Sequence, residues 1–174
     1  VSVKLASEGA KVVVNYFDNE SEANETVKLI ENAGGEAIAV YADATNLEDI
    51  SNLAKATTAA FGAKVDVLVN VAGGLFARKT ISELDVDFYN LLMDVNFKSS
   101  VFVTQAFKPL MGKGASIINF ASQAARDGGG PGASLYAASK AAVMTFTRAM
   151  AKEFGPDGIR VNALCPGMIA TKFH

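Results

Sequence analysis

A tyrosine and a lysine four residues apart are the side chains of this sequence whose chemistry is most distinctive. Tyr136 and Lys140 lie in a segment with a helical pattern, residues 134–154, so both side chains fall on one helix face, one turn apart. A free phenol has a pKa of about 10 and exchanges protons poorly at neutral pH. Because a nearby ammonium group stabilises a phenolate, the pair indicates a tyrosine that acts as general acid and base.

A serine lies 14 residues before this tyrosine, just after an apolar run at residues 115–120 that reads as a strand. The end of such a strand and the first turn of the next helix can meet at the mouth of a parallel sheet. Ser122 could there hydrogen-bond a substrate carbonyl to which Tyr136 gives its proton. The alternative is a surface tyrosine and lysine with a capping serine, because pairs at this spacing also occur by chance.

The composition excludes several other classes of protein. Half of the 174 residues are hydrophobic, which is enough to bury a core. The 16 Lys and Arg against 18 Asp and Glu argue against a nucleic-acid partner and against a disordered chain. The single cysteine, Cys165, excludes a disulfide framework, and the single histidine, His174, argues against a histidine-based dyad. We expect no metal site, no membrane span and a cytoplasmic location.

Short β-branched runs alternate with helical patterns along the chain. The predicted strands are residues 11–16, 36–41, 65–70, 115–120 and 159–164, and the predicted helices are 19–33, 46–61, 88–110 with a break at Pro109, and 134–154. This alternation predicts right-handed βαβ units and a parallel sheet. The strands are continuously apolar, which predicts helices on both faces. We therefore expect one doubly wound, three-layer α/β/α domain over residues 1–174.

Both ends of the chain lack the usual boundary signals. No Met, N-cap residue or turn precedes Val1 and Leu5, which lie on one face of a helix already under way, and Gly9 ends that helix. The other end stops with no obvious tail. We interpret the 174 residues as an internal part of a longer chain.

Taken together, the motifs resemble those of the short-chain dehydrogenase/reductase family over essentially the whole chain. The matching segments are Asp43, Asn70-Val71-Ala72-Gly73, Asp94-Val95-Asn96, Asn119-Phe120-Ala121-Ser122, Tyr136-Ala137-Ala138-Ser139-Lys140 and Arg160 to Gly167. Their order and spacing together are highly specific. Members of the 3-oxoacyl-[acyl-carrier-protein] reductase and glucose 1-dehydrogenase types look most similar.

The resemblance implies a Rossmann-like fold and hydride transfer between NAD(P)(H) and a carbonyl or alcohol. Tyr136 would be the general acid/base and also contact the cofactor, and Lys140 would assist it and hydrogen-bond the nicotinamide ribose. Ser122 would hold the substrate oxygen, and Asn96 would anchor a proton-relay water at a local break in its helix. The implied cofactor contacts are Asp43 and Ala44 at the adenine, Asn70, Ala72 and Gly73 on the adenosine side, and Pro166, Gly167, Ile169 and Thr171 on the nicotinamide side.

The sequence departs from the family pattern in three places. The Gly-rich phosphate loop and the central strand before it are absent, and residues 1–9 match the rest of the helix which that loop opens. Val71 replaces the second Asn of the family's Asn-Asn-Ala-Gly motif, and the chain stops where the family places its substrate lid. We expect the 174-residue segment alone to bind no dinucleotide in titration calorimetry.

The sequence gives only weak signals for the choice between NAD and NADP. Tyr16 aligns with the position at which an acidic residue selects NAD, so strong NAD selection is not evident. No Lys or Arg lies between Asn15 and Glu20, and Asp18 would repel a phosphate. We favour NADP slightly over NAD, because the selecting basic residues can belong to the absent loop.

Several functional alternatives stay open at this point. Within the family the first choice is a 3-oxoacyl-thioester reductase and the next a sugar or polyol dehydrogenase; a non-catalytic dinucleotide-binding relative is the other class. The loop at residues 125–132 either shapes the substrate pocket, with Arg126 on an anionic group, or is a flexible connector. The helices at 94–110 and 141–154 are apolar on several sides. The resemblance implies that they form a homotetramer or homodimer interface.

Overall fold

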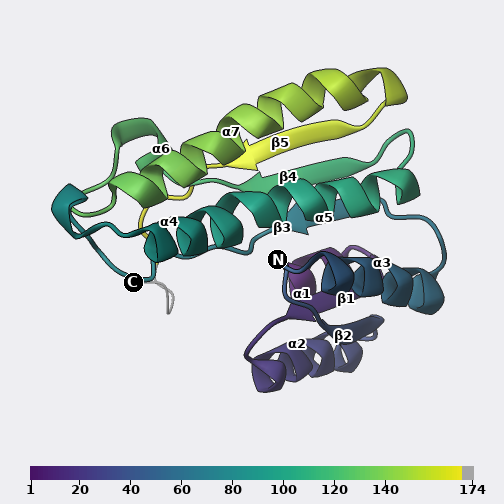
Figure 1. The fold of residues 1–174 in the computed structure, drawn as a ribbon. Coiled ribbons are helices and arrows are strands. Elements are labelled where there is room, and N and C mark those ends of the chain that lie inside the picture. The colour runs from purple at the N-terminus through teal and green to yellow at the C-terminus, as the bar shows by residue number, and fades with distance from the viewer. Residues whose placement is uncertain (170–174) are drawn as a thin grey trace. The chain divides into compact units, whose positions relative to one another are not determined.

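The structure is a computed structural model that describes residues 1–169. The chain divides into two compact units, Val1–Lys64 and Val65–His174 (Figure 1). All strand pairs are parallel, with the order β1-β2 in the first unit and β3-β4-β5 in the second. The prediction of an α/β fold with parallel strands is confirmed. Our prediction that residues 1–174 form one domain stays a prediction.

The first unit packs three helices against two strands. Its elements are α1 (Ser2–Ser7), β1 (Val12–Tyr16), α2 (Glu20–Asn32), β2 (Ala37–Tyr41) and α3 (Leu47–Phe61). The side chain of Asn19 caps α2 by accepting from Glu22 N, and that of Asn46 caps α3 by accepting from Glu48 N and Asp49 N. Parallel pairing sets Tyr16 opposite Tyr41 at the carboxyl end of this sheet.

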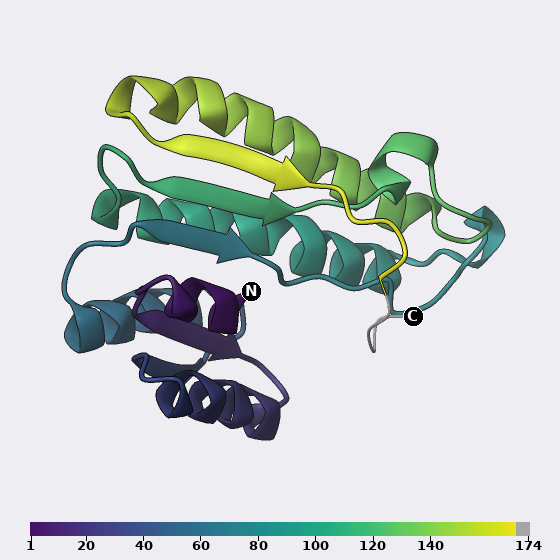
Figure 2. The ribbon, with the colours of Figure 1, turned by 180° about the vertical axis from the view of Figure 1, so that it is seen from behind.

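The second unit carries most of the elements that matter for function. They are β3 (Val67–Asn70), η1 (Ile81–Glu83), α4 (Val86–Met93), η2 (Asp94–Lys98), α5 (Ser99–Phe107), η3 (Lys108–Leu110), β4 (Ser116–Phe120), α6 (Ala124–Asp127), α7 (Ser134–Phe154), η4 (Gly155–Asp157) and β5 (Arg160–Leu164). In this unit α4, α5 and α7 lie along one face of the three strands, as the view from behind shows (Figure 2).

The helix predicted at residues 88–110 is not continuous. It begins at α4, which Asp85 caps by accepting from Phe88 N at 2.7 Å. At Asp94–Lys98 it widens into a π-helical turn, η2, before continuing as α5. It ends in a 3₁₀ turn that contains Pro109, because proline lacks the N–H that a continuing α-helix needs.

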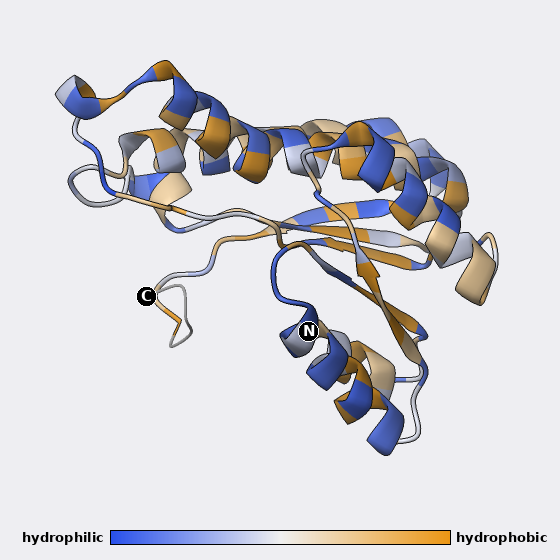
Figure 3. Ribbon diagram, turned by 60° about the horizontal axis from the view of Figure 1, so that its bottom comes forward, coloured by the Kyte–Doolittle hydropathy of each residue, from blue (hydrophilic) through white to orange (hydrophobic). Residues whose placement is uncertain are grey.

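Helices α5 and α7 bury one side against the sheet and leave another accessible. Val143 of α7 and Ile117 of β4 are fully buried, whereas Phe102, Phe146 and Met150 are half-buried. The helices carry hydrophobic and hydrophilic residues side by side along their length (Figure 3). Within residues 1–169, no helix combines the length and the apolar character that a membrane span requires.

Candidate active site

Tyr136 and Lys140 lie on the first two turns of α7 and are both buried. Their exposed fractions are 8% and 3%. The Lys140 Nζ donates to the carbonyl oxygen of Phe120, the last residue of β4, at 2.8 Å. Burial lowers the pKa of Lys140 to about 8. The alternative of a surface tyrosine and lysine is therefore wrong.

Ser122 follows β4 directly, two residues after the carbonyl that Lys140 contacts. The N–H of Ala124 donates to the Ser122 Oγ at 3.2 Å, so the hydroxyl keeps its own hydrogen for another acceptor. The flanking N–H groups of Ala121 and Gln123 donate to the carbonyls of Leu164 at 2.8 Å and Pro166 at 2.9 Å. The segment leading to Gly167 therefore runs beside Ser122 at the carboxyl edge of the sheet.

Asn96 lies in the π-helical turn η2 and is fully buried. Its side-chain amide makes two hydrogen bonds with the backbone of Gly74. Gly74 N donates to Asn96 Oδ1 at 2.9 Å, and Asn96 Nδ2 donates to Gly74 O at 2.9 Å. The predicted break in the helix is confirmed. The side-chain amide is thus engaged with Gly74, and the role of Asn96 in holding a water stays a prediction.

Gly73, in the loop after β3, lies close to both Lys140 and Asn96. A methyl group added at Gly73 would lie 2.6 Å from Lys140 Nζ and 2.6 Å from Asn96 Oδ1. Real side-chain carbons do not approach other atoms so closely, so any larger residue here would force Lys140 Nζ and the Asn96 amide to shift. The structure thus gathers Gly73, Asn96 and Lys140, which come from a loop, η2 and α7.

Asn70 belongs to a buried hydrogen-bond network that we call the asparagine–threonine network, comprising Asn70, Thr104, Asn119 and Thr147. The Asn70 Nδ2 donates to Thr104 Oγ1 at 3.2 Å and to Asn119 Oδ1 at 2.8 Å, and the Asn119 Nδ2 donates to Thr147 Oγ1 at 2.9 Å. Both donor hydrogens of the Asn70 amide are therefore engaged within this network. A cofactor contact of Asn70 stays a prediction, as do those of Ala72 and Gly73.

Phe76 is a residue of this loop that the sequence did not single out. Its φ is +60°, and Ala77 N donates to Leu75 O at 2.7 Å, which closes a γ-turn around Phe76. A non-glycine residue held in such a conformation costs about 1–3 kcal/mol. The signal that could have found it is weak: one aromatic residue in a short loop that begins with two glycines.

The loop at residues 128–133 is anchored rather than free. The Arg78 Nη1 donates to Pro131 O at 3.0 Å, and Lys79 N donates to Gly132 O at 3.0 Å. Both alternatives for residues 125–132, a loop that shapes the pocket and a flexible connector, stay predictions. Arg126 is exposed on α6, and its contact with an anionic group stays a prediction.

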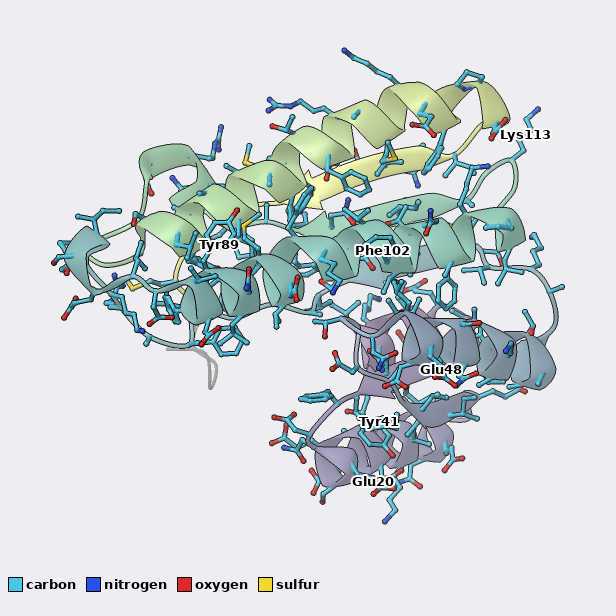
Figure 4. All side chains as sticks on the ribbon, viewed as in Figure 1. Glu20, Tyr41, Glu48, Tyr89, Phe102 and Lys113 are labelled. Carbon is cyan, nitrogen blue, oxygen red and sulfur yellow. The ribbon has the colours of Figure 1, made fainter. Side chains whose placement is uncertain are left out.

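The residues predicted at the adenine side lie in the first unit. Tyr16 and Phe17 both contact the Tyr41 ring, at centroid distances of 5.9 Å and 6.2 Å. Partial desolvation and the Glu20 carboxylate raise the pKa of Tyr16. Tyr41 and Glu20 are labelled in Figure 4.

Asp43 also has its side chain engaged within the first unit. Its Oδ1 accepts from Thr45 N and Thr45 Oγ1, both at 2.8 Å, which closes the turn before α3; its neighbour Ala44 is half-buried. In the second unit Ile169 is exposed, and Thr171 lies outside the described residues. Over residues 1–169, no three His, Cys, Asp or Glu side chains gather as a metal site would require.

Comparisons with known proteins match the chain over its length. A family model described as enoyl-(acyl carrier protein) reductase matches residues 1–174. A 3-oxoacyl-[acyl-carrier-protein] reductase of Synechocystis sp. is 40% identical over 173 residues, which cover 98% of this chain and 68% of the relative.

Two similar solved structures contain nicotinamide cofactors. A short-chain dehydrogenase from Burkholderia cenocepacia in complex with NADP is 32% identical with a TM-score of 0.93, and the match covers 99% of this chain and 71% of that one. The NADH-dependent reductase A1-R′ complexed with NAD is 34% identical with a TM-score of 0.90, covering 97% of this chain and 73% of that one.

Proposed function

Because the chain belongs to the short-chain dehydrogenase/reductase family, and is an NAD(P)-dependent oxidoreductase of that family, we propose that it reduces a carbonyl group with Tyr136 as the proton donor. The observation that carries the proposal is the buried pair on α7. Lys140 is held at the end of β4 by its bond to Phe120 O, so it stands between the tyrosine's helix and the serine's strand. A non-catalytic dinucleotide-binding protein would have no use for this set.

The surroundings of Lys140 fit the nicotinamide half of the cofactor. An ammonium group has three hydrogens, and the structure gives Nζ one acceptor, so further hydrogens are left for ribose hydroxyls. Pro166 and Gly167 continue along the same edge. The bound nicotinamide would supply the hydride, and the protein would supply position and a proton.

The three side chains divide the remaining work between them. The Ser122 hydroxyl, which accepts from Ala124 N, donates its hydrogen to the carbonyl oxygen and polarises it. Tyr136 gives the same oxygen its phenolic proton. The Lys140 ammonium stabilises the phenolate that remains, and its charge is effective because it is desolvated. A water held by Asn96 would return a proton to the site.

We infer a 3-oxoacyl-thioester substrate, because the relative that is 40% identical carries that name. A sugar or polyol is the alternative within the family. For the cofactor we keep a slight preference for NADPH, and we expect a cytoplasmic protein.

A panel of 3-oxoacyl thioesters and simple ketones with NADPH or NADH, and of sugars and polyols with NADP⁺ or NAD⁺, tests the proposal. The natural gene product that contains this chain should consume the reduced cofactor fastest with a thioester. Faster turnover of a sugar would contradict the substrate class. Tight cofactor binding without turnover of any member would contradict the enzyme itself.

A further inference from the structure

Ser139 is a fully buried serine between the two residues of the candidate active site on α7. Its exposed fraction is 0%, and its Oγ donates to the carbonyl oxygen of Tyr136 at 2.7 Å. We propose that Ser139 is a positioning residue, whose hydroxyl fixes the first turn of α7 and thereby the direction in which the Tyr136 side chain reaches the substrate. The inference rests on the proposed function, because it explains how the proton donor of that reaction is held.

The stability of the helix does not explain a serine at this position. The other residues around it, apart from Tyr136 and Lys140, are all alanines: Ala137, Ala138, Ala141 and Ala142. Alanine is the best helix former, whereas an interior serine that bonds a preceding carbonyl slightly destabilises a helix and often bends it. Alanine would also fit the space, since it lacks only the hydroxyl oxygen. The hydroxyl of Ser139 therefore has to be explained by something other than helix formation.

The first turn of α7, which carries Tyr136, begins without the usual stabilising side chains. Among the described residues, none caps this helix with a side-chain hydrogen bond, and its first turn contains no acidic residue. Helix ends of this kind tend to fray. In an α-helix the Tyr136 carbonyl accepts from the N–H of Lys140, and the Ser139 hydroxyl adds a further hydrogen bond to the same oxygen. The added bond restrains the turn that carries the tyrosine.

This bond links the placement of Tyr136 to that of Lys140. The Lys140 Nζ is held at the end of β4 by its bond to Phe120 O at 2.8 Å. Ser139 connects the backbone of Tyr136 to the residue directly before Lys140, so the phenol and the ammonium group keep one relative orientation. A hydrogen bond shielded from water, as this one is, is electrostatically stronger than one at the surface. Proton transfer depends on such placement, because a shift of roughly 1 Å can lower a rate about 100-fold.

Ser139→Ala in the natural gene product removes the hydroxyl and keeps the rest of the side chain. With the panel member that the wild type turns over fastest, we expect kcat to fall about tenfold, as for a displacement smaller than 1 Å, with an unchanged Kd for the reduced cofactor. The unfolding temperature should stay the same or rise, because alanine favours the helix.

Ser7→Ala is the matched control for this variant. The Ser7 Oγ also donates to a carbonyl three residues earlier, that of Lys4 at 2.8 Å, but at an exposed position on α1. The same substitution there should leave kcat unchanged.

A double-mutant cycle separates a positioning role from a purely structural one. If Ser139 acts through Tyr136, Ser139→Ala should change the residual kcat of Tyr136→Phe by less than about twofold, although it lowers that of the wild type about tenfold. Equal fold-changes in the two backgrounds would overturn the inference and assign Ser139 a general structural role. An unchanged kcat in Ser139→Ala, or a loss of rate accompanied by a lower unfolding temperature, would overturn it too.

Failure of the proposed function would look different in the same experiment. Tyr136→Phe would then retain the kcat of the wild type, whatever the effect of Ser139→Ala. The combination that we expect is a large loss in Tyr136→Phe, a tenfold loss in Ser139→Ala, and no further loss when the two are combined.

Discussion

Lys140 combines a buried position with a charge that the proposed chemistry needs. Desolvation disfavours its ammonium form and lowers its pKa to about 8, while its bond to Phe120 O fixes the group in place. The ammonium is therefore present at neutral pH but is lost under mildly alkaline conditions. An ordinary surface lysine would keep its proton until about pH 10.

This lowered pKa predicts an alkaline limit to activity. Below pH 8 Lys140 is protonated and stabilises the Tyr136 phenolate; above pH 8 it becomes neutral, so carbonyl reduction should fall as the pH rises through about 8. A pH profile of kcat checks this. Lys140→Arg should have a lower kcat and no fall near pH 8, because guanidinium stays charged. The same fall at the same pH in Lys140→Arg would assign the limit to another group.

Gly73 is the position at which the smallest added side chain should do most harm. In Gly73→Ala the new methyl group would meet both Lys140 Nζ and Asn96 Oδ1, so Lys140 must shift. We expect kcat/KM to fall about 100-fold, the effect of moving a catalytic group by roughly 1 Å. Steady-state kinetics measure it, with Gly112→Ala as the control, since a methyl group there meets no atom within 4 Å. Equal activities of the two variants would contradict the account.

At the scale of elements, the asparagine–threonine network joins two strands to two helices. Asn70 and Asn119 are paired residues of β3 and β4, Thr104 lies on α5, and Thr147 lies on α7. Thr147 is seven residues, or two turns, beyond Lys140, so α7 is attached to β4 at two points. This fixes the position of the helix along the strand, and with it the distance from Tyr136 to Ser122.

Loss of one acceptor in this network should weaken the whole second unit. Thr147→Val keeps the shape but leaves the buried Asn119 amide without its partner, at a cost of about 1–3 kcal/mol in the free energy of unfolding. Urea denaturation measures this. Thr145→Val, an exposed position on the same helix, is the control and should stay within about 0.5 kcal/mol. Equal stability of the two variants would show that the network contributes nothing.

Helices and strands were predictable from the sequence where the residue pattern within a single segment determines them. The helix at residues 134–154 and the cap at Asn46 are found as predicted, and each strand begins one or two residues later than expected. The π-helical turn required the resemblance, because it depends on Asn96 reaching Gly74, 22 residues away. Helix α6, in the loop after β4, and the γ-turn at Phe76, in the loop after β3, were missed, because both are too short to show a periodic pattern in the sequence.

For the candidate site, the sequence predicted which residues lie at the carboxyl edge of the sheet better than it predicted where their side chains point. Ser122, Lys140 and Gly73 meet at one edge because parallel strands end there. The buried amide of Asn70, by contrast, faces Thr104 and Asn119, partners 34 and 49 residues away along the chain. A strand-end position alone does not show to which side its side chain turns.

At the scale of the whole molecule, the half-buried apolar side chains of α5 and α7 are the surface on which we propose that a partner subunit packs. Phe102 on α5 is labelled in Figure 4, and Phe97 of η2 contacts Phe146 of α7 edge to face at 6.0 Å. We expect the natural gene product to be a homotetramer or homodimer in light scattering. Phe102→Lys should lower the measured mass, because burying an unpaired charge in an interface is costly. A monomeric wild type would contradict this expectation.

The central claim is that Tyr136 supplies the proton and that most of the cofactor's contacts come from other residues. Tyr136→Phe removes one oxygen and leaves the fold and the Lys140 contact with Phe120 O intact. Turnover and cofactor affinity, measured on the same preparation of wild type and Tyr136→Phe, test the claim most directly. We predict a kcat about 100- to 10,000-fold lower with an unchanged Kd for the reduced cofactor. An unchanged kcat in Tyr136→Phe would contradict the account.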